Sequence, residues 1–264
     1  MEYFKTCRNI PVYVSDSLNG AHTLVLLHGY LETNEVWADF ASLLTNGIRI
    51  IAIDLPGHGL SGTNSNENSM EFMADVLAEV LHHAKIEKAT VAGHSMGGYA
   101  ALAFAEKYPE MLEKLCLFHS TPNPDTDEKK QNRDREIALI RENRLASILN
   151  INIPNMFATE NRKRMDDCIV MISENATVSD TQGIIACLEG MKNRKDMNAF
   201  LAGFDKPLLL IFGKKDKYIA ENVAKELVEK FPEADVLMLE NSGHAGFLEE
   251  PETSANKIRE FVTG

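Results

Sequence analysis

The chain has 264 residues, of which 44% are hydrophobic and 25% charged, and its formal net charge is -12 at pH 7. These proportions are typical of a globular protein and exclude a disordered or fibrous chain. The negative charge argues against nucleic acid as a partner, because nucleic-acid binders usually carry a clustered basic surface. The four cysteines form no C-x-x-C pair, so we expect packing residues rather than disulfides or a zinc site.

Neither a targeting segment nor a membrane span is predicted. The stretch MEYFKTCRNIPVYVS lacks the architecture of a secretory signal, and no apolar run approaches the roughly 18 residues that a span needs. We therefore expect a cytoplasmic protein with no membrane partner. Its length suits one domain carrying an insertion, whereas its oligomeric state is left open.

Short apolar runs alternate with helical patterns along the chain. Runs rich in Val, Ile and Leu are typical of strands buried on both faces. They lie at residues 22–29, 48–54, 88–94, 114–120, 206–213 and 234–241. Helical spacing is found from Met70 to Ala84, with Asn68 and Glu71 placed as a capping box, and again over 217–231. This alternation predicts an α/β fold, with helices on both faces of a largely parallel sheet.

Residues 121–202 interrupt the alternation. They contain no convincing strand pattern, begin with a highly charged stretch and continue as several short helical segments. We therefore predict a core formed by residues 1–120 and 203–264, and a helical insertion over 121–202 between two strands of the sheet.

The segment GHSMG, residues 93–97, places a serine between two glycines where a strand pattern changes to a helix pattern. This is the G-x-S-x-G nucleophile elbow, in which Ser95 occupies a strained turn. Side chains two residues before and after the serine would collide with the neighbouring strand and helix, so Gly93 and Gly97 suit their positions. The pattern predicts Ser95 as a nucleophile.

A serine nucleophile needs a base and an orienting acid, in the chain order Ser, Asp or Glu, His. Asp216 follows the apolar run PLLLIF, and His244 follows DVLMLE. Both are expected at carboxyl ends of strands, where catalytic groups of α/β sheets gather. Glu240 is a weaker rival for the acid because it lies within a strand-like run. The remaining histidines fit the base position less well: His22, His58, His82, His83, His94 and His119.

The oxyanion formed during acyl transfer needs hydrogen-bond donors. One predicted donor is the backbone N–H of Met96, directly after the serine. The other is the N–H of Tyr30, because His28 and Gly29 let the chain turn tightly after an earlier strand.

The segments HGYLETNEVW, DLPGHGLSG, GHSMGG, FGKKD and SGHAGFLEEP together resemble the α/β-hydrolase superfamily. Within it, the chain is similar to capped serine hydrolases: esterases, cofactor-free haloperoxidase-like enzymes and C–C bond hydrolases. The resemblance implies an α/β-hydrolase fold with a mainly parallel eight-stranded sheet, two further strands at 2–6 and 10–15, and a helical cap at 121–202. It also implies loop-holding roles for Asp54 and His58.

The resemblance further implies catalysis by Ser95, Asp216 and His244 without a cofactor or metal, on a small-molecule substrate. Apolar cap residues between Ile148 and Leu188 favour ester hydrolysis of a partly apolar compound. Two alternatives stay open. One is a C–C bond hydrolase or lyase of the menaquinone-type synthase kind, for which Arg162, Lys163 and Arg164 could bind a carboxylate. The other is a slow-turnover ligand receptor that retains the triad.

Overall fold

The computed structural model describes residues 1–44, 47–63 and 65–264. Its centre is an eight-stranded sheet in the order β1-β2-β4-β3-β5-β6-β7-β8. The strands are β1 (Glu2–Cys7), β2 (Ile10–Asp16), β3 (His22–Leu27), β4 (Ile48–Ile53), β5 (Ala89–His94), β6 (Leu112–Phe118), β7 (Leu208–Gly213) and β8 (Asp235–Leu239). All eight predicted strands are therefore confirmed, within a few residues at each end.

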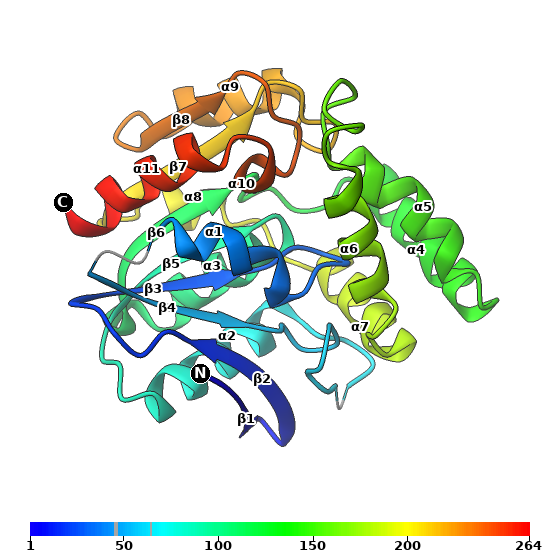
Figure 1. Cartoon of the computed structure of the whole chain (residues 1–264), viewed down its shortest axis with the longest axis horizontal. Helices are drawn as coiled ribbons and strands as arrows, with labels where there is room; N and C mark the ends of the chain where they lie inside the picture. The colour runs from blue at the N-terminus through cyan, green and yellow to red at the C-terminus, as the bar shows by residue number, and fades with distance from the viewer. Residues whose placement is uncertain (45–46, 64) are drawn as a thin grey trace.

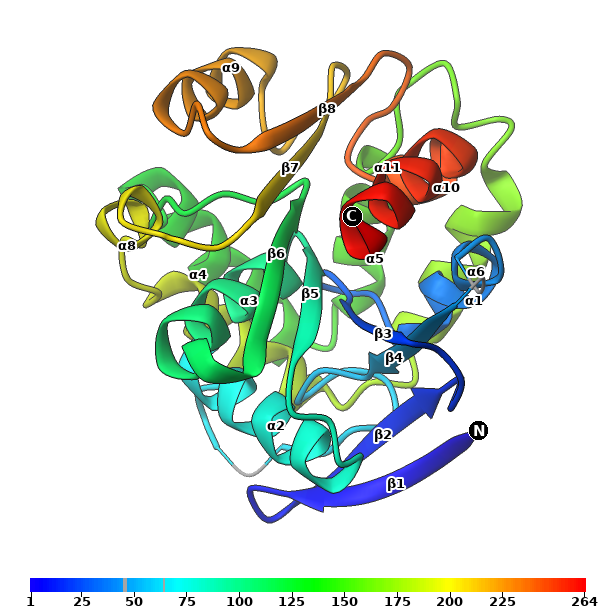
Figure 2. The ribbon, with the colours of Figure 1, turned by 90° about the vertical axis from the view of Figure 1, so that its left-hand side faces the viewer.

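Parallel pairing extends from β4 to β8, whereas β2 is antiparallel to both β1 and β4. The central strands are buried along their whole length because helices cover both faces. In Figure 2, α2, α3, α8 and α9 lie on one side of the sheet, and α1 and α11 on the other. These helices are α1 (Ala38–Ser42), α2 (Met70–His83), α3 (Met96–Lys107), α8 (Asn198–Ala202), α9 (Glu221–Lys230) and α11 (Pro251–Thr263).

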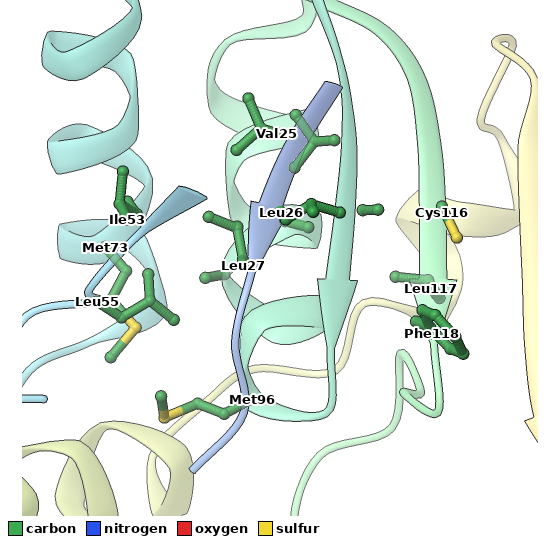
Figure 3. Packing of buried hydrophobic residues seen from close by; sticks show 14 of the residues in the cluster. Val25, Leu26, Leu27, Ile53, Leu55, Met73, Met96, Cys116, Leu117 and Phe118 are labelled. Carbon is green, nitrogen blue, oxygen red and sulfur yellow. The ribbon is translucent and has the colours of Figure 1, made fainter. Parts of the chain in front are cut away.

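Large apolar side chains from neighbouring strands and from the covering helices form the core. Figure 3 shows Leu27 of β3, Leu117 and Phe118 of β6, and Met73 of α2 in this packing. The carboxyl ends of the parallel strands consequently meet at one rigid edge of the sheet.

Four helices lie at that edge (Figure 1), and all belong to the segment between β6 and β7. They are α4 (Asp127–Arg141), α5 (Leu145–Asn155), α6 (Asp166–Ala176) and α7 (Thr181–Lys192). Short 3-10 helices at Asn34–Trp37 and Pro109–Met111, and α10 (Gly246–Glu249), complete the elements. Among the described residues, no helix combines the length and apolar character that crossing a membrane requires.

Two expectations about local structure were inaccurate. The N-cap of α2 is Ser69, whose hydroxyl accepts the Phe72 N–H, while Asn68 is buried and donates instead to the carbonyl of Pro56. The helix expected over 217–231 begins only at Glu221. In the first case tertiary contacts of Asn68 override the local capping pattern.

Candidate active site

Ser95 lies on the turn between β5 and α3, at the carboxyl edge of the sheet. Its φ of 50° and ψ of -113° fall in the strained region that a nucleophile elbow requires. The turn is fixed by a bond from the Ser95 N–H to the Phe118 carbonyl and by one from the Ser120 hydroxyl to the Ser95 carbonyl. These bonds hold the strained backbone without involving the Ser95 hydroxyl.

The two flanking glycines are required by close backbone approach. A Cβ on Gly93 would lie 2.3 Å from the Gly97 carbonyl oxygen, and a Cβ on Gly97 would lie 2.4 Å from that of Leu27. No side chain fits at either distance, which agrees with the steric reasoning from sequence. The same contact brings the start of α3 directly against the end of β3.

Asp216 and His244 are brought together as predicted. Asp216 follows β7 and His244 follows β8, and the His244 Nδ1 lies 2.7 Å from the Asp216 Oδ2. Both are buried, with 7% and 4% of their surface exposed. The other oxygen of Asp216 accepts the backbone N–H groups of Tyr218 and Ile219, so the carboxylate is held in one orientation.

His119 is a second histidine on the same carboxylate oxygen, at 3.3 Å through its Nδ1. Its Nε2 accepts the Gly246 N–H, so the neutral ring donates from Nδ1. Burial lowers the pKa of His119 to about 4, with the Asp216 bond acting against this shift. For Asp216, burial alone would raise the pKa, but the charge of His244 and the bonds from both histidines hold it well below its usual range. Asp216 is therefore an anion at neutral pH.

The loop carrying His244 is tied to the segment between α5 and α6. The His244 N–H donates to the Met156 carbonyl, and Glu249 accepts the N–H groups of both Gly243 and Ala158. The position of His244 thus depends on the helical segment above the sheet edge as well as on β8.

Two backbone amides, those of Tyr30 and Met96, are the predicted oxyanion donors. Within the part of the chain that the structure describes, the N–H groups of Tyr30 and Met96 have no hydrogen-bond acceptor. Met96 is the first residue of α3, where the helix leaves its N–H groups unpaired. The contact between Gly97 and the end of β3 places the two segments side by side. Unpaired amides at a helix start favour a negative oxygen.

In the described part of the chain, the Ser95 hydroxyl and the His244 ring are not hydrogen-bonded to each other. The His244 ring lies instead against the ring of His94, the residue that precedes Ser95 in the sequence, with the two ring centroids 4.9 Å apart. In free enzymes the bond between nucleophile and base is commonly long and tightens with substrate.

A buried pair that sequence reasoning missed is Glu32 with His94. The Glu32 Oε2 lies 2.9 Å from the His94 Nδ1 and accepts the Gly29 N–H at 2.6 Å. The His94 Nε2 donates to the His244 carbonyl oxygen at 2.7 Å. Burial alone would lower the pKa of His94 and raise that of Glu32, but their mutual attraction reverses both shifts. The position of His94 beside Ser95 was the available signal.

The rival residues lie elsewhere. Glu240 is 65% exposed and pairs with Lys214, away from His244. Asp54 accepts from Asn34 and from the Leu60 N–H, and His58 accepts the Leu31 N–H, so both hold loops as implied. Of the three basic residues considered for a carboxylate, Arg162 donates to Asn155 and Arg164 to the Glu249 carbonyl, while Lys163 is exposed.

Ligand atoms of His119, Asp216 and His244 lie within 4.8 Å of one another, which is close enough for a metal ion. However, the two Asp216 oxygens already receive four donors, and the His119 Nε2 is occupied by an amide. The three side chains therefore fit a hydrogen-bonded acid–base pair with a supporting histidine better than they fit a metal site.

Comparison with known proteins identifies the fold. Residues 22–152 match the family described as alpha/beta hydrolase fold. A thermophilic esterase from Thermogutta terrifontis, solved with malate bound, has a TM-score of 0.92 and 27% identity, over 99% of this chain and 97% of that one.

Sequence relatives have several reaction names. A Bacillus subtilis (strain 168) protein with the provisional name 2-succinyl-6-hydroxy-2,4-cyclohexadiene-1-carboxylate synthase is 29% identical, over 93% of this chain and 92% of its own length. A 2-hydroxy-6-oxononadienedioate/2-hydroxy-6-oxononatrienedioate hydrolase of Cupriavidus pinatubonensis is 29% identical, over 88% of this chain and 84% of its own length. The resemblance inferred from the motifs is confirmed.

Proposed function

Because this chain has the α/β-hydrolase fold and its relatives include hydrolases, we propose that it is a serine hydrolase that cleaves an ester or related acyl bond of a small molecule. The observation that carries the proposal is the buried His244–Asp216 pair beside the strained turn of Ser95. Four free thiols suit a reducing compartment, so we place the activity in the cytoplasm.

Catalysis proceeds in two steps. His244 takes the Ser95 proton through its Nε2, and the serine oxygen attacks the carbonyl carbon while Asp216 stabilises the imidazolium. The amides of Tyr30 and Met96 hold the tetrahedral oxyanion. His244 then protonates the departing alcohol, leaving an acyl group on Ser95. Water, deprotonated by His244, releases the acid and restores the serine.

We also propose that residues 121–202 act as a cap over this site. Supporting the proposal, α4 to α7 lie at the carboxyl edge of the sheet (Figure 1), and Met156 contacts the His244 loop. Gly183 of α7 and Gly57 of the core approach so closely that a Cβ on Gly57 would lie 2.6 Å from the Gly183 carbonyl oxygen. Such contacts fix the cap helices against the core.

A second candidate is the C–C bond reaction on a diketone or cyclic acid. The names of two relatives, a cyclohexadiene carboxylate synthase and an oxononadienedioate hydrolase, favour it. The same triad would serve both reactions, so the substrate decides between them.

The test is hydrolysis of p-nitrophenyl acetate and of a dienedioate ketone by the wild type and by Ser95→Ala. We expect ester turnover that Ser95→Ala lowers by at least about 10³-fold, because the nucleophile is lost. Ser173→Ala is the control, since its hydroxyl bonds only within α6 and it should match the wild type. Ester turnover that survives in Ser95→Ala would refute the assignment, and turnover of the ketone alone would select the second candidate.

A further inference from the structure

Four residues, linked by three hydrogen bonds, form a continuous connection between the Tyr30 loop and the Asp216 loop. The Tyr30 hydroxyl donates to the Glu136 Oε2 at 3.1 Å, and the Asn152 Nδ2 donates to the Glu136 Oε1 at 2.8 Å. The Tyr218 hydroxyl donates to the Asn152 carbonyl at 2.9 Å. We call Tyr30, Glu136, Asn152 and Tyr218 the arch.

The two ends of the arch belong to the catalytic loops. Tyr30 is the residue whose amide we assign to the oxyanion, and Tyr218 lies two residues after Asp216, with its ring centroid 4.9 Å from that of His244. The two middle residues belong to α4 and α5. The arch therefore joins the proposed oxyanion loop to the Asp216 loop through α4 and α5.

Glu136 carries the negative charge of the arch. Its hydrogen-bond donors are neutral, and among the described residues no Lys or Arg forms an ion pair with it. Arg133, one turn earlier on α4, forms its ion pair with Asp125, although its charge also acts on Glu136 and on Tyr30. Arg162 is the cation whose charge acts on Tyr218, but its guanidinium donates to Asn155. The carboxylate at the centre of the arch is thus uncompensated by a direct partner.

The field of Glu136 reaches both ends of the arch. Burial is the largest cause of the raised pKa of Tyr30 and of Tyr218, and the negative charge of Glu136 is the next cause for each. Because the Tyr218 ring contacts the His244 ring, a substrate bound beside His244 would experience the same charge. At separations of several ångströms, a half-buried carboxylate still repels another anion appreciably.

We propose that Glu136 sets the charge preference of the site: it disfavours acyl groups with a terminal carboxylate and favours neutral or cationic ones. The proposal rests on the proposed acyl-transfer function and specifies its substrate class. This preferred substrate charge would differ from that suggested by the names of two relatives, which describe a carboxylate and a dioate. Glu136 lies on α4, and no residue of this helix takes part in the proposed acyl transfer.

The experiment compares three p-nitrophenyl esters of similar shape. Their acyl groups are 5,5-dimethylhexanoate, which is neutral, 4-(trimethylammonio)butanoate, which is its cationic isostere, and glutarate, which ends in a carboxylate. For the wild type we expect kcat/KM for the cationic ester to exceed that for the anionic ester by about tenfold or more. In Glu136→Gln, which keeps an acceptor for Tyr30, this ratio should fall by about tenfold.

Asp134→Asn is the matched control because it removes the same charge from the same helix. Asp134 is 59% exposed and pairs with Lys192, so its removal should leave the ratio at the wild-type value. Each ratio is taken within one preparation, so a partly unfolded fraction cancels.

The outcomes separate the two proposals. A wild-type preference for glutarate, or a ratio that Glu136→Gln does not change, would overturn the role of Glu136 while the hydrolase assignment stands. A wild type that cleaves none of the esters would overturn the proposed function and this inference with it.

Discussion

At the scale of single residues, Asp216 is the most highly coordinated group of the site. Two histidines share its Oδ2 and two amides share its Oδ1, which fixes the carboxylate and keeps it charged. His119, with its pKa near 4, stays neutral and adds a donor without adding charge. In the proposed mechanism, Asp216 therefore fixes the tautomer of His244 and provides the counter-charge that its imidazolium needs.

Replacing Asp216 with Asn should lower kcat by up to about 10⁴-fold while leaving the fold intact, because His244 loses both the counter-charge and the control of its tautomer. Steady-state kinetics and an unfolding curve measure the two effects. Glu240→Gln is the control because this rival acid is exposed and should retain wild-type kcat. A loss in Glu240→Gln and none in Asp216→Asn would exchange the two assignments.

Sequence reasoning identified the residues that obey a motif and missed those that act through packing. Ser95, Asp216 and His244 follow strands that their apolar patterns reveal, so their order along the chain was sufficient to propose them. Glu32 and Glu136 carry no such signal, because their partners His94 and Tyr30 are distant in sequence. Only the fold brings these pairs together.

At the scale of elements, the Glu32–His94 pair joins three loops that carry the proposed catalytic groups. Glu32 accepts from Gly29 in the oxyanion loop, His94 begins the elbow, and His94 donates to the backbone of His244. Both side chains are fully buried. Because His94 donates from Nε2, one proton is shared between its Nδ1 and Glu32, which keeps the pair neutral overall.

Glu32→Leu should destabilise the fold by about 3 to 5 kcal/mol, since it leaves His94 and the Gly29 amide without their partner. It should also lower kcat, because the three loops lose their common contact. Glu32→Gln should recover part of both losses, since its amide oxygen can take the place of the Glu32 Oε2 and accept the Gly29 N–H. Urea unfolding and kcat are the measurements. If the two variants behave alike, hydrogen bonding by this pair does not hold the loops.

The elements themselves were predictable where the pattern was long and regular. Six strands were found because parallel strands are apolar throughout, whereas the antiparallel β1 and β2 were implied only by the resemblance. The α3 helix was found because helix-forming residues follow the elbow. Helix boundaries were less predictable. The N-cap of α2 is Ser69 and not Asn68, because the Asn68 side chain bonds to the Pro56 carbonyl in another part of the fold. The arrangement of α4 to α7 over the sheet edge has no signature in the periodicity of the sequence.

At the scale of the whole molecule, buried histidines determine how stability depends on pH. Burial lowers the pKa of His28, His58 and His119, so each is neutral in the folded protein and takes up a proton on unfolding below pH about 6.5. His94 has a raised pKa and is protonated in both states there, so it does not oppose this effect. The unfolded state thus binds more protons under mildly acidic conditions.

The free energy of unfolding should therefore fall as pH is lowered from about 6.5 towards 4. His119→Gln, which retains a polar group, should reduce the slope by about 1.4 kcal/mol per pH unit, the contribution of one proton. Urea unfolding at a series of pH values measures it. A free energy that is constant over this range, or an unchanged slope in His119→Gln, would contradict the neutral state of these rings.

The central claim is that Ser95 is the nucleophile, and covalent labelling tests it most directly. A fluorophosphonate is attacked by an activated serine, with loss of fluoride, whereas ordinary serines do not react. Intact-mass spectrometry followed by peptide mapping should find one adduct per folded chain, on Ser95, and none in Ser95→Ala. An adduct on another residue, or no adduct on folded wild-type protein, would contradict the account.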